Sequence, residues 1–126
     1  MDDARRRRRG LKVRREVLGA AHVARATAEA TALDREFQDL VTRYVWGEIW
    51  TRPGLDLRSR RILVMGTMIA IGRWEEFRMH AVAALREGGF TTDDLKEIVL
   101  QQAIYCGVPV AHHALKLIGE LETAGR

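Results

Sequence analysis

Residues 51–71, which read TRPGLDLRSRRILVMGTMIAI, decide the fold. The stretch begins with a break, because Pro53 biases the residue before it towards extended geometry and Gly54 permits a turn. Asp56 is then a suitable N-cap for a helix over 57–71. Apolar side chains occupy most sides of that helix, so we expect it to be central or pressed against another subunit.

Helices also account for the rest of the chain. No segment sustains the apolar–polar alternation of a half-buried strand, and helix-forming Ala, Leu, Arg and Glu dominate. After residue 71 the sequence predicts three more helices, over 74–87, from Thr91 or Thr92 to about 105, and over about 109–123. Glycines mark the breaks between them: Gly72 allows a bend, Gly88 and Gly89 end the first of the three helices, and Gly107 ends the second. The sequence therefore predicts an all-α protein of about six to seven helices.

The N-terminal part is less regular. Residues 11–18 favour a short first helix that ends near Gly19, and the pattern over 22–31 is ambiguous. A capping-box spacing at 31–34 predicts a helix that continues to about residue 50. Its apolar positions recur at helical spacing, so we expect one face to be buried; the residues of that face are Phe37, Leu40, Val41, Tyr44 and Val45.

Length and composition exclude several classes of protein. A chain of 126 residues can bury one core, and 47% hydrophobic with 30% charged residues is an ordinary globular balance. The single cysteine, Cys106, excludes an internal disulfide, a dithiol redox pair and a multi-cysteine zinc site, so we expect no metal and a reducing, cytoplasmic compartment. No apolar run reaches membrane-spanning length, and no apolar signal core follows the basic N-terminus.

The basic character belongs to one end of the chain. Residues 1–15 hold eight basic and two acidic groups, whereas the remaining residues hold 13 basic and 15 acidic groups. The run from Arg5 to Arg9 can bind nucleic-acid phosphates, but no aromatic interleaving or base-reading helix accompanies it. For residues 1–9 we therefore favour a solvated, disordered tail rather than a nucleic-acid-binding segment.

His80 is the first candidate for chemistry. It lies beside the apolar face of the helix over 74–87, and Glu76 precedes it by one turn on the same face. A carboxylate in that position can orient the imidazole, and an apolar wall can tune its pKa towards neutrality. A core-edge histidine in a helical ion pair is the plainer reading and stays open.

A second candidate cluster surrounds the break before residue 57. Glu48 can act as an acid or base, Trp50 can wall a pocket, and Arg52 can grip a carboxylate as a fork. The plainer reading makes the tryptophans packing anchors and Glu48 a structural ion-pair partner. Arg60 lies next to an apolar pair at the start of the following helix, so we expect it to be drawn inward towards an anionic partner.

Three motifs together resemble a known family. The stretches GLKVRREVLG at 10–19, WGEIWTRPGLD at 46–56 and IYCGVP at 104–109 are similar to the 4-carboxymuconolactone decarboxylases, over roughly residues 10–122. The resemblance implies one domain over 10–126, an alkylhydroperoxidase-D-like helical fold and a homo-oligomer, commonly a hexamer. Peroxidase relatives carry the motif C-x-x-C-x-x-x-H, whose histidine corresponds to His80. Arg73 and Glu76 stand at its two cysteine positions, so dithiol chemistry is absent.

The resemblance also implies a reaction that needs no cofactor. In the protocatechuate branch of aromatic catabolism, 4-carboxymuconolactone, a small anionic lactone, loses carbon dioxide and becomes the 3-oxoadipate enol-lactone. We expect His80, oriented by Glu76, to donate the proton, with Glu48 as a second acid/base. We expect the substrate to be bound by Arg52, Arg60, Trp50 and Arg73. Two alternatives stay open: a paralogue that acts on a different cyclic acid or lactone, and a non-enzymatic helical module for oligomerisation or nucleic-acid binding.

Overall fold

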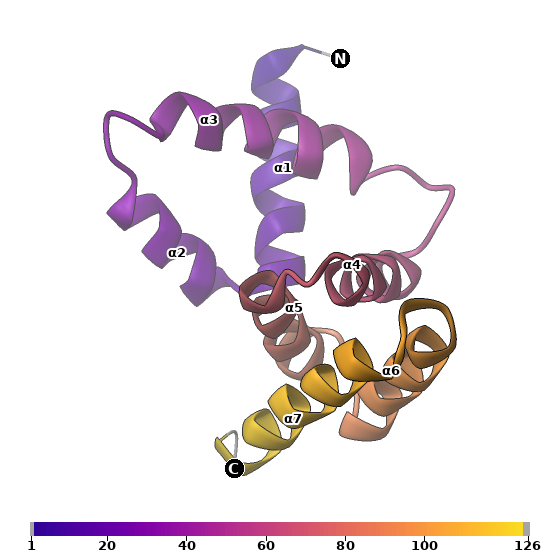
Figure 1. Cartoon of the computed structure of the whole chain (residues 1–126). Helices are drawn as coiled ribbons and strands as arrows, with labels where there is room; N and C mark the ends of the chain where they lie inside the picture. The colour runs from indigo at the N-terminus through magenta and orange to yellow at the C-terminus, as the bar shows by residue number, and fades with distance from the viewer. Residues whose placement is uncertain (1, 125–126) are drawn as a thin grey trace. The chain divides into compact units, whose positions relative to one another are not determined.

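The computed structural model describes residues 2–124, and every regular element in that range is helical (Figure 1). The chain divides into two compact units, one up to Leu57 and the other from Arg58 onward. The elements are α1 (Asp3–Leu18), α2 (Ala20–Glu29), α3 (Arg35–Leu40), the π-helical segment η1 (Val41–Ile49), α4 (Leu57–Ile71), α5 (Trp74–Glu87), α6 (Thr92–Cys106) and α7 (Val108–Ala124). The predicted all-α class is confirmed.

The first unit is organised by the packing of α1 on η1. Gly10 of α1 lies against the backbone of Thr42, and Gly47 of η1 lies against the backbone of Arg6. A Cβ atom at either glycine would overlap a carbonyl oxygen, so only glycine permits this approach of the two backbones. The close approach selects which face of η1 is buried.

The prediction of which face of this segment is buried is wrong. Phe37 is 61% exposed, Leu40, Tyr44 and Val45 are also exposed, and Val41 is only half-buried. α1 covers the opposite side of the segment, and the residues buried there are Thr42, Trp46 and Gly47. The apolar stripe is therefore left uncovered within the chain.

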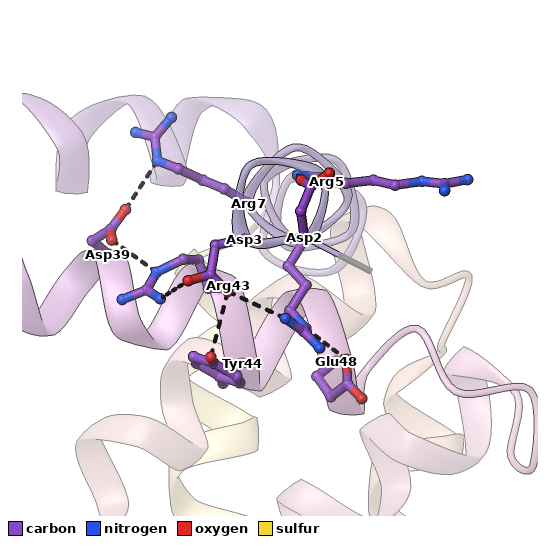
Figure 2. Close-up of polar contacts among 9 residues, drawn as sticks. Asp2, Asp3, Arg5, Arg7, Asp39, Arg43, Tyr44 and Glu48 are labelled. Carbon is purple, nitrogen blue, oxygen red and sulfur yellow. Dashed lines mark hydrogen bonds and ion pairs between the residues drawn. The ribbon is translucent and has the colours of Figure 1, made fainter.

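The arginine run also differs from the expected disordered tail. Residues Asp3 to Arg9 are the first turns of α1, and Asp2 caps that helix by accepting a hydrogen bond from the Arg5 backbone N–H at 2.8 Å. Ion pairs to η1 hold the helix in place: Arg6 reaches Glu48 at 3.1 Å, and Arg43 reaches Asp3 at 3.1 Å (Figure 2). These cross-helix pairs lie between the first turns of α1 and η1.

The second unit holds the main apolar cluster. Met65 and Ile69 from α4 pack with Phe77 and Ala81 from α5, together with buried residues of α6 and α7. Thr91 and Asp94 form a capping box at the start of α6, because each side chain accepts from the other's backbone N–H. The predicted helices over 57–71 and 74–87 are confirmed residue by residue.

Candidate functional site

The end of η1 places two of the expected site residues. The π-helical register brings Trp46 and Trp50 together with ring centroids 4.9 Å apart, and Trp46 is buried while Trp50 is half-buried. The Trp50 backbone N–H donates to the Val45 carbonyl at 3.0 Å, which closes the last wide turn. The Arg52 backbone N–H donates to the Ile49 carbonyl at 3.1 Å, so Arg52 directly follows this helix end.

A pocket of about 470 Å³ opens beside this helix end, within the first unit. We call it the η1-end pocket. It is lined from α1 by Arg9, Lys12, Val13 and Glu16, and from the η1 end and the following loop by Trp50, Thr51, Arg52, Pro53, Leu55, Asp56 and Leu57. Its volume is within the range of small-molecule sites, and its wall combines apolar side chains with a few charged groups.

The η1-end pocket is suited to an anion. Arg9, Lys12 and Arg52 contribute three positive charges against the carboxylates of Glu16 and Asp56. Over residues 2–124, no carboxylate pairs with the ammonium group of Lys12. A carboxylate ligand with an apolar ring would therefore find cationic partners for its charge and apolar side chains for its ring in this pocket.

Sequence reasoning missed Arg9 and Lys12 as site residues. The sequence pattern predicts that Arg9 belongs to a disordered tail and indicates no role for Lys12. A signal was present, because positions 9, 12, 13 and 16 fall on one face of a helix that starts at residue 3. Extending the predicted first helix back through the arginine run would have revealed that face.

Glu48 has a structural partner. Its carboxylate accepts a hydrogen bond from Nε of Arg6 at 3.1 Å, and this bond raises the pKa of Arg6 (Figure 2). The pair joins α1 to η1 across 42 residues of sequence. The plainer reading of Glu48, a structural ion pair, thus has a named partner, while its acid/base role stays a prediction.

His80 and Glu76 share one face of α5 in the second unit. His80 is 7% exposed and lies between the buried residues Phe77 and Ala84 on that face, as its spacing predicted. Glu76 is half-buried one turn earlier. The imidazole therefore has an apolar wall, and a carboxylate lies at the distance of one helical turn.

The arginines of the second unit are placed differently from expectation. Arg60 is half-buried, whereas its neighbour Arg61 is 3% exposed and packs so closely against Gly88 that a side chain there would collide with it. Burial lowers the pKa of Arg61. Arg60 is thus drawn partly inward, and Arg61 is the more deeply buried arginine because it lies on the α4 face towards the core with Met65 and Ile69.

Arg73 lies at the other end of α4. It is exposed and occupies the N-cap position of α5. Thirteen residues separate it from Arg60, which corresponds to about 20 Å at the rise of an α-helix. Among residues 2–124, no cluster of three metal-binding side chains is present.

Comparisons with known proteins give one consistent result. The family model described as "Carboxymuconolactone decarboxylase family" matches residues 35–120. The chain is 38% identical to the 4-carboxymuconolactone decarboxylase of Acinetobacter baylyi over 121 residues, which are 96% of this chain and 90% of that protein. It is 40% identical over 106 residues to the nitrosuccinic acid decarboxylase npaB of Metarhizium robertsii, covering 84% of this chain and 73% of that protein. A 4-carboxymuconolactone decarboxylase sequence from Pseudomonas putida matches at 42% identity over 48 residues, 38% of this chain and 100% of that sequence.

Proposed function

Because the chain belongs to the carboxymuconolactone decarboxylase family, we propose that it is a carboxy-lyase that converts 4-carboxymuconolactone to the 3-oxoadipate enol-lactone. The observation that carries this proposal is the 38% identity over 96% of the chain to the enzyme of Acinetobacter baylyi with that name. The cationic η1-end pocket supports it, because the substrate is a small anion with a ring. The reaction belongs to protocatechuate catabolism.

The substrate supplies its own electron sink. The bond from the ring carbon to one carboxylate breaks, and its electron pair passes through the C=C bond to the lactone carbonyl. A dienolate forms, carbon dioxide leaves, and a proton added to a ring carbon gives the enol-lactone. The protein must therefore bind a second carboxylate, stabilise charge on the lactone oxygen and donate one proton.

Arg52 and Trp50 bind the substrate in this proposal. The planar guanidinium of Arg52 suits a carboxylate, and the half-buried Trp50 ring provides an apolar wall for the lactone. Arg60 is the second candidate for a carboxylate or enolate contact. Arg73 is the weaker candidate, because it lies about 20 Å from Arg60 along α4 and is exposed.

His80 donates the proton, with Glu76 as the residue that positions its ring. The burial of His80 beside Phe77 gives its ring an apolar surrounding, and the imidazole must regain a proton from solvent after each turnover. Glu48 is the second acid/base candidate; a proton transfer by Glu48 requires its bond to Arg6 to loosen.

The direct test is a time course of purified protein with 4-carboxymuconolactone, followed by ultraviolet absorption and mass spectrometry. Loss of one carbon dioxide per substrate with formation of the enol-lactone is the expected result. Nitrosuccinic acid is the second substrate to assay, because the similarity to npaB favours a dicarboxylic nitro acid as the alternative. Turnover of nitrosuccinic acid alone would replace the proposed substrate, and turnover of neither by folded protein would refute it.

Variants separate proton transfer from binding. His80→Gln is expected to lower kcat by about 10²–10⁴-fold with little change in KM, because it removes the proton donor. Arg52→Ala is expected chiefly to raise KM, and Arg8→Ala, which removes an exposed arginine of α1, is the matched control. Near-wild-type kcat in His80→Gln would remove that residue from the proton-transfer role.

We also propose that the chain forms a homo-oligomer, with a hexamer favoured, in the cytoplasm. Two sets of large apolar side chains are exposed within the chain: Phe37, Leu40, Tyr44, Val45 and Ile49 on α3 and η1, and Leu100, Ile104, Tyr105, Val108 and Leu115 on α6 and α7. Copies of the same chain would bury such surfaces. Over residues 2–124, no helix combines the length and apolar character needed to cross a membrane. Light scattering with size-exclusion chromatography measures the assembly, and a monomer at micromolar concentration would refute it.

A further inference from the structure

A second pocket lies in the first unit on another face of α1. We call it the α1–α3 pocket; its volume is about 980 Å³. It is lined by Arg7, Leu11 and Arg14 of α1, by Ala26, Thr27, Ala30 and Ala32 of α2 and the following loop, and by residues 35–40, 42 and 43 of α3 and η1. It shares no lining residue with the η1-end pocket, so the proposed substrate site does not explain it.

Arg14 is the unusual residue of this pocket. Its guanidinium is partly buried and meets only neutral partners: one terminal nitrogen donates to Gln38 at 3.1 Å, and the other donates weakly to Thr42 at 3.4 Å. Its Nε is buried and has no hydrogen-bond partner. Burial lowers the pKa of Arg14. The group is therefore a partly desolvated cation with no carboxylate partner within the described residues 2–124.

The other charges around the pocket are already matched or exposed. Arg7 and Arg43 both bind Asp39, at 3.0 Å and 2.9 Å (Figure 2). Arg35 and Glu36 at the start of α3 are exposed. Within the described residues 2–124, no carboxylate pairs with Arg14.

A partly buried guanidinium without an anion is unfavourable, since it has lost part of its water and gained no opposite charge. Each terminal nitrogen of Arg14 carries two N–H groups and uses one of them within the protein. The two that remain are charged donors, and a carboxylate has two oxygens that can accept from them. Leu11, Phe37 and Leu40 add apolar surface for a short carbon body.

We propose that the α1–α3 pocket is a carboxylate-binding site in which Arg14 holds the anion through its two terminal nitrogens. The carboxylate belongs either to a free organic acid or to an Asp or Glu side chain of a second copy of this chain. Both sources place the same group on the same guanidinium. The site is independent of the proposed decarboxylation, because none of the residues assigned to that reaction lines the pocket.

The test uses the full chain with succinate as the probe, compared with sodium chloride at equal sodium concentration. Calorimetric titration of the wild type is expected to show saturable succinate binding. Arg14→Gln is expected to weaken that binding at least tenfold. Arg15→Gln is the matched control, because it removes the same charge from the adjacent, exposed position, and it is expected to bind as the wild type does.

A second measurement distinguishes the source of the carboxylate. If a second copy supplies it, Arg14→Gln raises the dissociation constant of self-association at least tenfold, and succinate competes with assembly of the wild type. Arg14→Met repeats both measurements in a variant that keeps an apolar stem, with circular dichroism as the check of folding. Succinate binding and self-association that are both unchanged in the two Arg14 variants would overturn the proposal.

Discussion

Replacing Gly10 by Ala tests the close contact that organises the first unit. The new Cβ would overlap the Thr42 carbonyl oxygen and would also lie at about 3.0 Å from the Gly47 backbone nitrogen. Both neighbours are backbone atoms, so no side-chain rotation relieves the overlap and α1 must move away from η1. Such overpacking costs about 3 kcal/mol at the upper end of its usual range, while the better helix propensity of Ala returns about 1 kcal/mol. We expect a net loss of about 2 kcal/mol.

Thermal unfolding measures this loss. An unfolding entropy of about 2.1 cal/mol/K per residue amounts to about 0.26 kcal/mol/K for 126 residues, so Tm is expected to fall by about 8 °C. Gly119→Ala in α7 is the control, because a Cβ there meets nothing within 4 Å; it is expected to raise Tm slightly. If Gly10→Ala raises Tm as Gly119→Ala does, the backbone contact does not hold the two helices together. Scans at a fixed protein concentration keep self-association constant.

Three further predictions concern single contacts. Thr91→Ala removes the N-cap of α6 and is expected to lower the free energy of unfolding by about 1 kcal/mol, measured by urea denaturation. Gln102→Met removes the 2.9 Å hydrogen bond to the Gly66 carbonyl and is expected to lower it by a similar amount, about 1 kcal/mol; an unchanged midpoint would contradict the bond's contribution. Burial and the charge of Arg25 lower the pKa of His22, so the unfolded chain binds more protons than the folded chain below about pH 6.5. Stability is therefore expected to fall as the pH drops below that value, and His22→Asn should flatten a plot of Tm against pH.

Much of the second unit could be predicted from the sequence because the residues that specify its helix boundaries lie next to those boundaries. Gly72, Gly89 and Gly107 each adopt a positive φ, a conformation that glycine reaches without strain, and each lies between two helices. Thr91 and Asp94 specify the start of α6 within four residues of sequence. Boundaries of this kind need no knowledge of what packs against the helix.

The buried face of the first unit could not be predicted in the same way. Spacing identifies the apolar stripe around Phe37 but not which side α1 covers, and that choice depends on Gly10 and Gly47, 37 residues apart. The π-helical register of η1 also shifts which residues share a face, and no local signal marks it. The prediction that this stripe is apolar is correct, and the prediction that another part of the chain covers it is wrong.

The candidate site shows the same division between local and long-range information. The burial of His80 followed from its place in the periodicity of α5. The sequence pattern predicts an inward position for Arg60 and not for Arg61. Adjacent residues of a helix point in different directions, so a small error in the predicted buried face exchanges the two. Lys12 and Arg9 were missed because their contribution to a pocket depends on α1 beginning at residue 3.

The way in which α1 is held has a consequence for motion. Ion pairs with exposed members and the close backbone approach at Gly10 and Gly47 join α1 to η1, whereas the second unit has a connected apolar cluster. Exposed ion pairs contribute little to stability, so α1 and η1 should separate transiently at a lower free energy than the helices around Met65. Native-state hydrogen exchange would then show the amides of α1 exchanging before those of α4. The arginine-rich helix would be the part of the chain that opens first, and both pockets of the first unit would open with it.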